Sequence, residues 1–133
     1  MPRFIPTKFH APLDYSVGAA LIDAPWILQF SEHTAAAVVP IVLGVGLIAY
    51  SLFTNYELGV WKVAPMAVHN LIDVVAGALL ALSPWLFGFA DEGANVWVPH
   101  LFVGLAAMFL GLTTRQQGGY SYRTSGTAIT GVR

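Results

Sequence analysis

The sequence predicts an all-α integral membrane protein with four transmembrane helices, arranged as two tandem two-helix hairpin repeats. Three observations predict this fold: a very apolar composition, four apolar segments of membrane-spanning length, and an internal repeat. Of the 133 residues, 56% are hydrophobic and only 10% are charged, whereas a soluble domain carries about 25% charged residues. A bilayer can solvate so apolar a surface and water cannot. The net charge of −1 excludes a polybasic nucleic-acid-binding protein.

The four apolar segments cover about residues 11–30, 34–53, 63–89 and 96–113. Each is close to the roughly 20 residues that cross about 30 Å of hydrocarbon as an α-helix. They do not follow the strict alternation expected of a membrane β-barrel. We therefore expect four transmembrane helices joined into two hairpins.

The internal repeat is found when the sequence is shifted by 59 positions and compared with itself. The matched residues are Pro6 and Pro65, His10 and His69, Asp14 and Asp73, Gly18 and Gly77, Pro25 and Pro84, Trp26 and Trp85, Phe30 and Phe89, and Pro40 and Pro99. Such a period indicates a duplicated unit. Each unit crosses the membrane twice, so we expect a pseudo-two-fold axis along the membrane normal. The match also argues that the first segment is a helix rather than a cleaved signal peptide.

The repeat divides the chain into five parts: a cytoplasmic N-terminal segment (1–10), a first repeat (11–54), a cytoplasmic linker (55–62), a second repeat (63–114) and a polar cytoplasmic tail (115–133). All lysines and arginines lie outside the two hairpin tips, and the tips carry acidic residues. The positive-inside rule therefore places both termini and the linker in the cytoplasm. In the linker, Tyr56 and Trp61 suit the aromatic belt of a membrane interface. The tail is rich in Gly, Ser and Thr, and by itself should be disordered.

Two matched pairs of ionisable residues stand out: His10 with Asp14, and His69 with Asp73. The i, i+4 spacing places each pair on one helix face, and ionisable groups at membrane depth normally face a bundle interior. One interpretation is a proton-handling or ligand-binding site. The other, which we favour, is a pair of hydrogen-bonded clamps that lock the repeats together.

We expect no cofactor or metal. Axial histidines could hold haem, but the sequence has no further cofactor signal, and each histidine has an aspartate to satisfy it. A zinc site would require His10, His69 and both aspartates to converge. There is no cysteine, so disulfides and thiolate metal sites are impossible. We interpret Asp23 and His100, which lack counterparts in the other repeat, as residues solvated at the membrane boundary.

The segment Ser83-Pro84-Trp85 ends the third apolar helix, and Ala24-Pro25-Trp26 is its counterpart in the first. Proline bends or ends a helix, and tryptophan anchors at headgroup level. We interpret Pro25, Trp26, Ser83, Pro84 and Trp85 as a device that kinks and anchors the outer boundary. Ser83 has no adjacent base and is matched by Ala24, so we expect no catalytic role for it and no enzymatic activity.

Small residues allow close approach of transmembrane helices. Gly18 and Gly77 each lie four residues after the aspartate of their repeat. We therefore expect the shared His-Asp-Gly face to form the contact between the first and third helices.

With these motifs in place, the chain resembles the SPW repeat family of prokaryotic integral membrane proteins. The resemblance covers about residues 6–114, and the second copy carries the full Ser83-Pro84-Trp85 motif, whereas the first has Ala24. It implies a four-helix, multi-pass protein of the prokaryotic inner (cytoplasmic) membrane, and it implies no activity.

We rank three functions. A non-enzymatic scaffold or accessory subunit of a larger membrane assembly comes first. An oligomeric small transporter, channel or proton-conducting unit using the His-Asp pairs is the alternative. A cofactor-binding protein or enzyme is third. The expected partners are the lipid bilayer and either a second copy or another membrane protein, and no nucleic acid.

Overall fold

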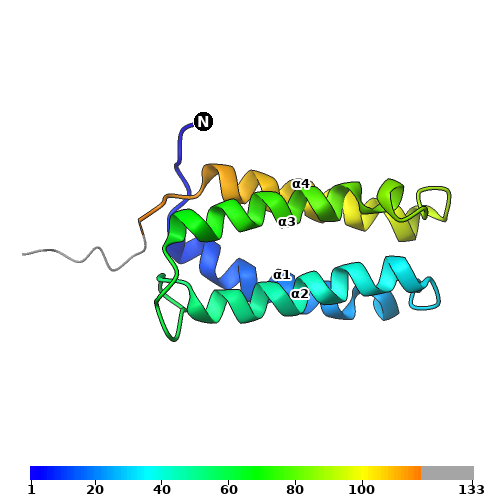
Figure 1. Cartoon of the computed structure of the whole chain (residues 1–133), viewed down its shortest axis with the longest axis horizontal. Coiled ribbons are helices and arrows are strands. Elements are labelled where there is room, and N and C mark those ends of the chain that lie inside the picture. Colours follow the sequence, from blue (N-terminus) through cyan, green and yellow to red (C-terminus); the bar gives the residue numbers. More distant parts are fainter. Residues whose placement is uncertain (118–133) are drawn as a thin grey trace, which may run out of the picture.

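The computed structural model describes residues 1–117, and that part of the chain contains four helices. They are α1 (Thr7–Ile27), α2 (Thr34–Phe53), α3 (Met66–Leu86) and α4 (Ala94–Thr113). Figure 1 shows two hairpins side by side, one of α1 and α2 and the other of α3 and α4. Packing is closest within each hairpin, and the hairpins meet mainly through α2 and α3. The predicted disordered tail lies almost wholly outside the described residues.

Helix α1 begins earlier than the predicted residue 11. Pro6 is extended and caps it, so the helix starts at Thr7. Proline suits this position because the first turn of a helix needs no donor from it. As a consequence, His10 lies in the first turn of α1 rather than in a preceding segment. Pro65 caps α3 in the same way, ahead of Met66.

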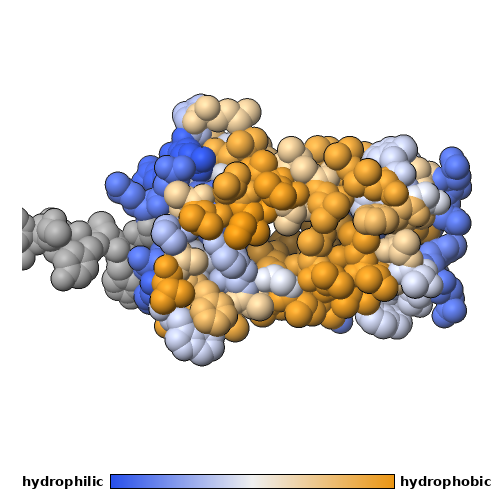
Figure 2. Space-filling model, viewed as in Figure 1, coloured by the Kyte–Doolittle hydropathy of each residue, from blue (hydrophilic) through white to orange (hydrophobic). Residues whose placement is uncertain are grey.

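Three of the four helices, α2, α3 and α4, are long and apolar enough to cross a membrane. Helix α1 has 21 residues but also carries three charged residues, Lys8, Asp14 and Asp23. Figure 2 shows apolar side chains over the middle of the molecule and polar ones at its two ends. This distribution fits a protein whose central part lies in the hydrocarbon core of a membrane and whose two ends lie among headgroups and water.

Each hairpin is closed by a pair of glycines whose backbones touch. A Cβ built on Gly18 would lie 3.1 Å from the Gly44 carbonyl oxygen, and one built on Gly77 would lie 2.6 Å from the Gly104 carbonyl oxygen. The predicted contact of these glycines between the first and third helices is therefore wrong. They pack α1 on α2 and α3 on α4.

The reason for this error is helix geometry. Eight residues at 3.6 per turn advance about 80° beyond two full turns. The stripe His10, Asp14, Gly18 therefore winds around α1, and its glycine end reaches the face that meets α2. The histidine end still faces α3, as the ion pairs below require.

Candidate functional site

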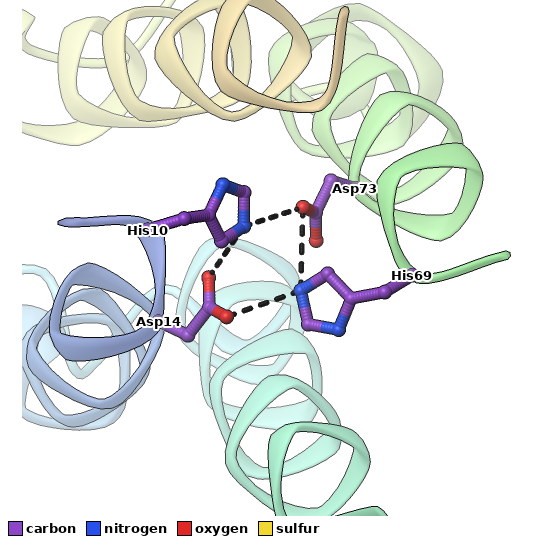
Figure 3. A group of neighbouring side chains, drawn as sticks. All are labelled: His10, Asp14, His69 and Asp73. Atoms are coloured by element: carbon purple, nitrogen blue, oxygen red, sulfur yellow. Dashed lines mark ion pairs between the residues drawn. The ribbon is translucent and has the colours of Figure 1, made fainter. Parts of the chain in front are cut away.

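Four ionisable side chains meet at one end of the bundle, two from α1 and two from α3. His10 Nε2 lies 3.0 Å from Asp14 Oδ1 and 3.0 Å from Asp73 Oδ2. His69 Nε2 lies 3.1 Å from Asp14 Oδ2 and 3.4 Å from Asp73 Oδ2. Figure 3 shows the resulting ring, in which each histidine faces both aspartates. The two predicted pairs thus form one cluster, which we call the His-Asp cluster.

The His-Asp cluster is sealed from solvent. Both histidines are 0% exposed, and Asp14 and Asp73 are 4% and 7% exposed. Charges so deeply placed are costly unless they are paired. The pairs run across the two hairpins as well as along each helix, so the cluster ties α1 to α3.

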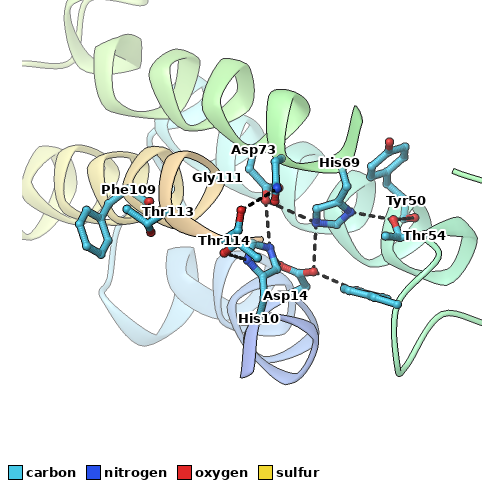
Figure 4. A network of polar contacts seen from close by, with 12 residues as sticks. His10, Asp14, Tyr50, Thr54, His69, Asp73, Phe109, Gly111, Thr113 and Thr114 are labelled. Carbon is cyan, nitrogen blue, oxygen red and sulfur yellow. Dashed lines mark hydrogen bonds and ion pairs between the residues drawn. The ribbon is translucent and has the colours of Figure 1, made fainter. Parts of the chain in front are cut away.

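The outer nitrogen of each histidine is held by a threonine just beyond the end of a helix. His69 Nδ1 lies 2.7 Å from Thr54 Oγ1, and His10 Nδ1 lies 2.7 Å from Thr114 Oγ1. Both threonines follow the last residue of their helix and have extended backbones. One-residue parallel bridges hold them, Thr54 with Ala64 and Thr114 with Ile5. Figure 4 shows this network.

Further polar contacts surround the cluster. The Tyr56 hydroxyl donates to Asp14 Oδ2 at 2.8 Å, and Tyr50 stacks on His69 with ring centroids 5.1 Å apart. The Asn70 amide donates to the Thr114 carbonyl at 3.2 Å, and Arg3 Nη1 donates to the same carbonyl at 2.8 Å.

The prediction that Tyr56 lies in an interfacial aromatic belt is wrong, because Tyr56 is 0% exposed. Burial, and then the nearby Asp14 charge, raises the pKa of the Tyr56 phenol, which therefore stays a donor. Sequence reasoning missed Tyr56, Thr54 and Thr114 as neighbours of the cluster. A possible signal was a threonine directly after each of the second and fourth apolar segments.

Ser83 has a local structural task that the neighbouring proline creates. Because Pro84 has no N–H, it cannot donate to the Leu80 carbonyl four residues earlier. The Ser83 hydroxyl donates to that carbonyl at 2.7 Å instead, and Ser83 is 0% exposed. The serine of the Ser-Pro-Trp segment thus satisfies an acceptor that the proline leaves open.

Replacing Ser83 with alanine should therefore leave the Leu80 carbonyl unsatisfied and destabilise the protein by about 1–3 kcal/mol. Denaturant titration of the purified chain in detergent, followed by circular dichroism, measures the change. Ser16→Ala is a control, because its hydroxyl is exposed and donates to the Pro12 carbonyl on the surface. Equal destabilisation by the two variants would contradict this role for Ser83.

The other residues of the predicted boundary device lie in the last turns of α1 and α3. Pro25 is buried, whereas Trp26 and Trp85 are 61% and 56% exposed. Two residues after the end of each helix stands a residue of positive φ, Gln29 at 60° and Gly88 at 74°. Directly after each, Phe30 and Phe89 fold back into a shared apolar cluster. The outward-facing tryptophans have the placement that an interfacial anchor requires.

His100 links the hairpins at this other end of the bundle. Its Nε2 lies 2.9 Å from the Ala36 carbonyl of α2, and the residue is 2% exposed. Pro40 cannot donate to that carbonyl, so the Ala36 oxygen is open to the imidazole. His100 Nδ1 also lies 2.6 Å from the Val96 carbonyl, and a neutral His100 can donate to one of the two. The interpretation of His100 as a boundary residue in contact with water is wrong. Asp23 is exposed, as expected.

Comparison with curated proteins and with solved structures finds no match to the chain. A family model, the SPW repeat domain, matches residues 8–114. The matched region includes the whole His-Asp cluster and both proline-tryptophan segments. It also includes the four helices, apart from Thr7 at the start of α1. The chain therefore belongs to the SPW repeat domain family.

Proposed function

We propose that this protein is a non-enzymatic scaffold or accessory subunit of a larger membrane assembly. One observation carries the proposal: the four ionisable residues of the cluster pair with one another across the two hairpins. The His-Asp cluster is buried and joins α1 to α3. Its chemistry is thus used to hold two hairpins together. The apolar outer surface of the helices remains available to lipid and to partner helices.

We further propose that α1 is a fourth transmembrane helix and that the two hairpins arose by duplication. Helices α1 and α2 are connected at the tip in the same way as α3 and α4. Contacts of matched type support the duplication: Thr54 holds His69 as Thr114 holds His10. Both termini and the residue 54–65 loop would face the cytoplasm of a prokaryotic cell, and both tips the outside.

Cysteine labelling tests this topology, because the natural chain has no cysteine. A membrane-impermeant maleimide applied to intact cells should label Glu32→Cys and Asp91→Cys at the tips. Phe4→Cys and Asn55→Cys should react only after the membrane is permeabilised. All four positions are exposed. Labelling of Phe4→Cys and Glu32→Cys from the same side would mean that α1 does not cross.

The accessory role is tested by comparing masses in mild detergent. The chain extracted from its native membrane should sediment as a larger particle than the same chain expressed alone. Identical sedimentation of the two would remove the support for a larger assembly.

The alternative, a proton-conducting unit, is favoured by one observation. A cavity of about 330 Å³ between the hairpins is bordered by Asp73 and Tyr50 among mainly apolar residues. In proteoliposomes with an imposed potential, a scaffold should give no proton flux above empty vesicles. Flux that is lost in Asp73→Asn, with folding retained, would favour the alternative.

A further inference from the structure

We propose that the His-Asp cluster binds one divalent transition-metal ion, with Zn²⁺ the best match. This inference goes beyond the scaffold role and does not depend on it. It also departs from the sequence-based expectation of no metal. A zinc site requires His10, His69 and both aspartates to converge, and in the structure they do converge. His10, Asp14, His69 and Asp73 offer ligand atoms that all lie within 4.8 Å of one another.

The nitrogen–oxygen spacing around the ring is close to that of ligands on one ion. With zinc–ligand bonds of about 2.0–2.1 Å, neighbouring ligand atoms of a tetrahedral site lie about 3.3 Å apart. The four nitrogen–oxygen distances of the cluster are 3.0, 3.0, 3.1 and 3.4 Å. Both oxygens of Asp14 take part in these four contacts. A tetrahedral ion at the centre of the ring in Figure 3 would bring all four ligand atoms, which now lie within 4.8 Å of one another, to about 3.3 Å.

Within residues 1–117, three inward-facing atoms have no hydrogen-bond partner, although oppositely charged neighbours surround them. They are His10 Nε2, His69 Nε2 and Asp73 Oδ2, all fully buried. Each histidine nitrogen lies between two carboxylates, and a single N–H cannot point at both. Buried polar atoms without a partner are rare in folded proteins. A metal ion, which all three atoms could share, would satisfy them together.

The threonine contact selects the form of His69 that binds metal. The Thr54 hydroxyl donates its one proton to the Tyr50 carbonyl at 3.0 Å, so its oxygen accepts from His69 Nδ1 at 2.7 Å. A neutral His69 then carries its proton on Nδ1, and its lone pair on Nε2 points into the cluster. Metal-binding histidines are typically oriented by such an outer hydrogen bond. Thr114 stands in the same place beside His10.

Charge and donor type favour a borderline transition metal. Two carboxylates and two neutral imidazoles carry a charge of −2, which one divalent cation neutralises. Imidazole nitrogen favours Zn²⁺ and its neighbours in the transition series over Mg²⁺ and Ca²⁺, which prefer all-oxygen sites. A cavity of about 50 Å³ bordered by His10, Asp14 and Asp73 lies beside the cluster.

The test uses the full chain, purified in detergent with a histidine-free tag and stripped with a chelator. Zn²⁺ is added and bound metal is measured by mass spectrometry after gel filtration, and Co²⁺ is added in parallel to record its visible absorption. We expect one Zn²⁺ per chain and the intense bands of tetrahedral Co²⁺. Asp73→Asn should lower the affinity by about tenfold or more. His33→Ala, at the exposed tip, should bind as the natural chain does.

A second variant separates a metal site from a cluster held only by ion pairs. Asp73→His keeps a metal ligand but cannot pair with a protonated His10 or His69. We expect this variant to retain Zn²⁺ and to be more stable with the metal than without it. The proposal is overturned if the folded natural chain binds no more Zn²⁺ than Asp73→Asn. Co²⁺ spectra that are the same for the natural chain and for Asp73→His would also overturn it.

Discussion

Replacing Asp14 with alanine is expected to destabilise the protein by about 3–5 kcal/mol, because it removes one of the two carboxylates that pair with the buried histidines. Asp14 lies within 3.1 Å of both His10 and His69, and it accepts the Tyr56 hydroxyl at 2.8 Å. The variant would therefore leave three buried groups without a shared acceptor. Low polarity around the cluster makes that loss larger than it would be at a surface.

Denaturant titration in detergent micelles, followed by circular dichroism, measures this change. Asp23→Ala is the matched control, because Asp23 lies on the same helix and is exposed. Its effect should stay within about 0.5 kcal/mol, as for most surface substitutions. Unfolding of Asp14→Ala at the same denaturant concentration as Asp23→Ala would show that the cluster does not hold the hairpins together.

Replacing Gly104 with alanine is the second large effect, with an expected loss of about 3 kcal/mol from overpacking. The added Cβ would lie 2.4 Å from the Ala81 nitrogen and 2.5 Å from the Gly77 carbonyl oxygen. Both are backbone atoms of α3, which cannot rotate away as a side chain could. The helices must separate, and they lose packing along their whole contact.

Gly46→Ala tests the same chemical change without the close contact. No atom of the described part of the chain lies within 4 Å of a Cβ at Gly46. Only the helix preference for alanine over glycine then acts, which stabilises by up to about 1 kcal/mol. The two variants should thus shift the unfolding midpoint in opposite directions. A shift of the same sign and size in both would contradict the proposed role of the Gly77 and Gly104 contact.

The residues of the His-Asp cluster, and their place between the first and third helices, were predictable from the sequence, but their closure into one ring was not. The i, i+4 spacing and the repeat identify His10, Asp14, His69 and Asp73 as paired and inward-facing. Spacing along one helix carries no information on the rotation of that helix against another. The convergence of both pairs, and with it the possibility of a metal site, depends on how the two hairpins pack.

The wrong predictions for Tyr56 and His100 have the same explanation. Tyr56 is of a residue type common at membrane interfaces, but it is buried, and its hydroxyl donates to Asp14. His100 lies beside the Ala36 carbonyl, an acceptor 64 residues away in the chain that Pro40 leaves open. Both contacts join segments distant in sequence, and no local pattern announces them.

The sequence by itself determined the helical hairpins, the apolar central part of the bundle and the positions of the prolines that bend or cap the helices. These features depend on composition, periodicity and local backbone chemistry, which a chain carries wherever it folds. The tertiary structure alone decided which glycines touch, which donors reach the open carbonyls, and that four separate ionisable groups form one cluster. Those outcomes depend on the rotation and register of one hairpin against the other, which follow from the packing of all their side chains at once.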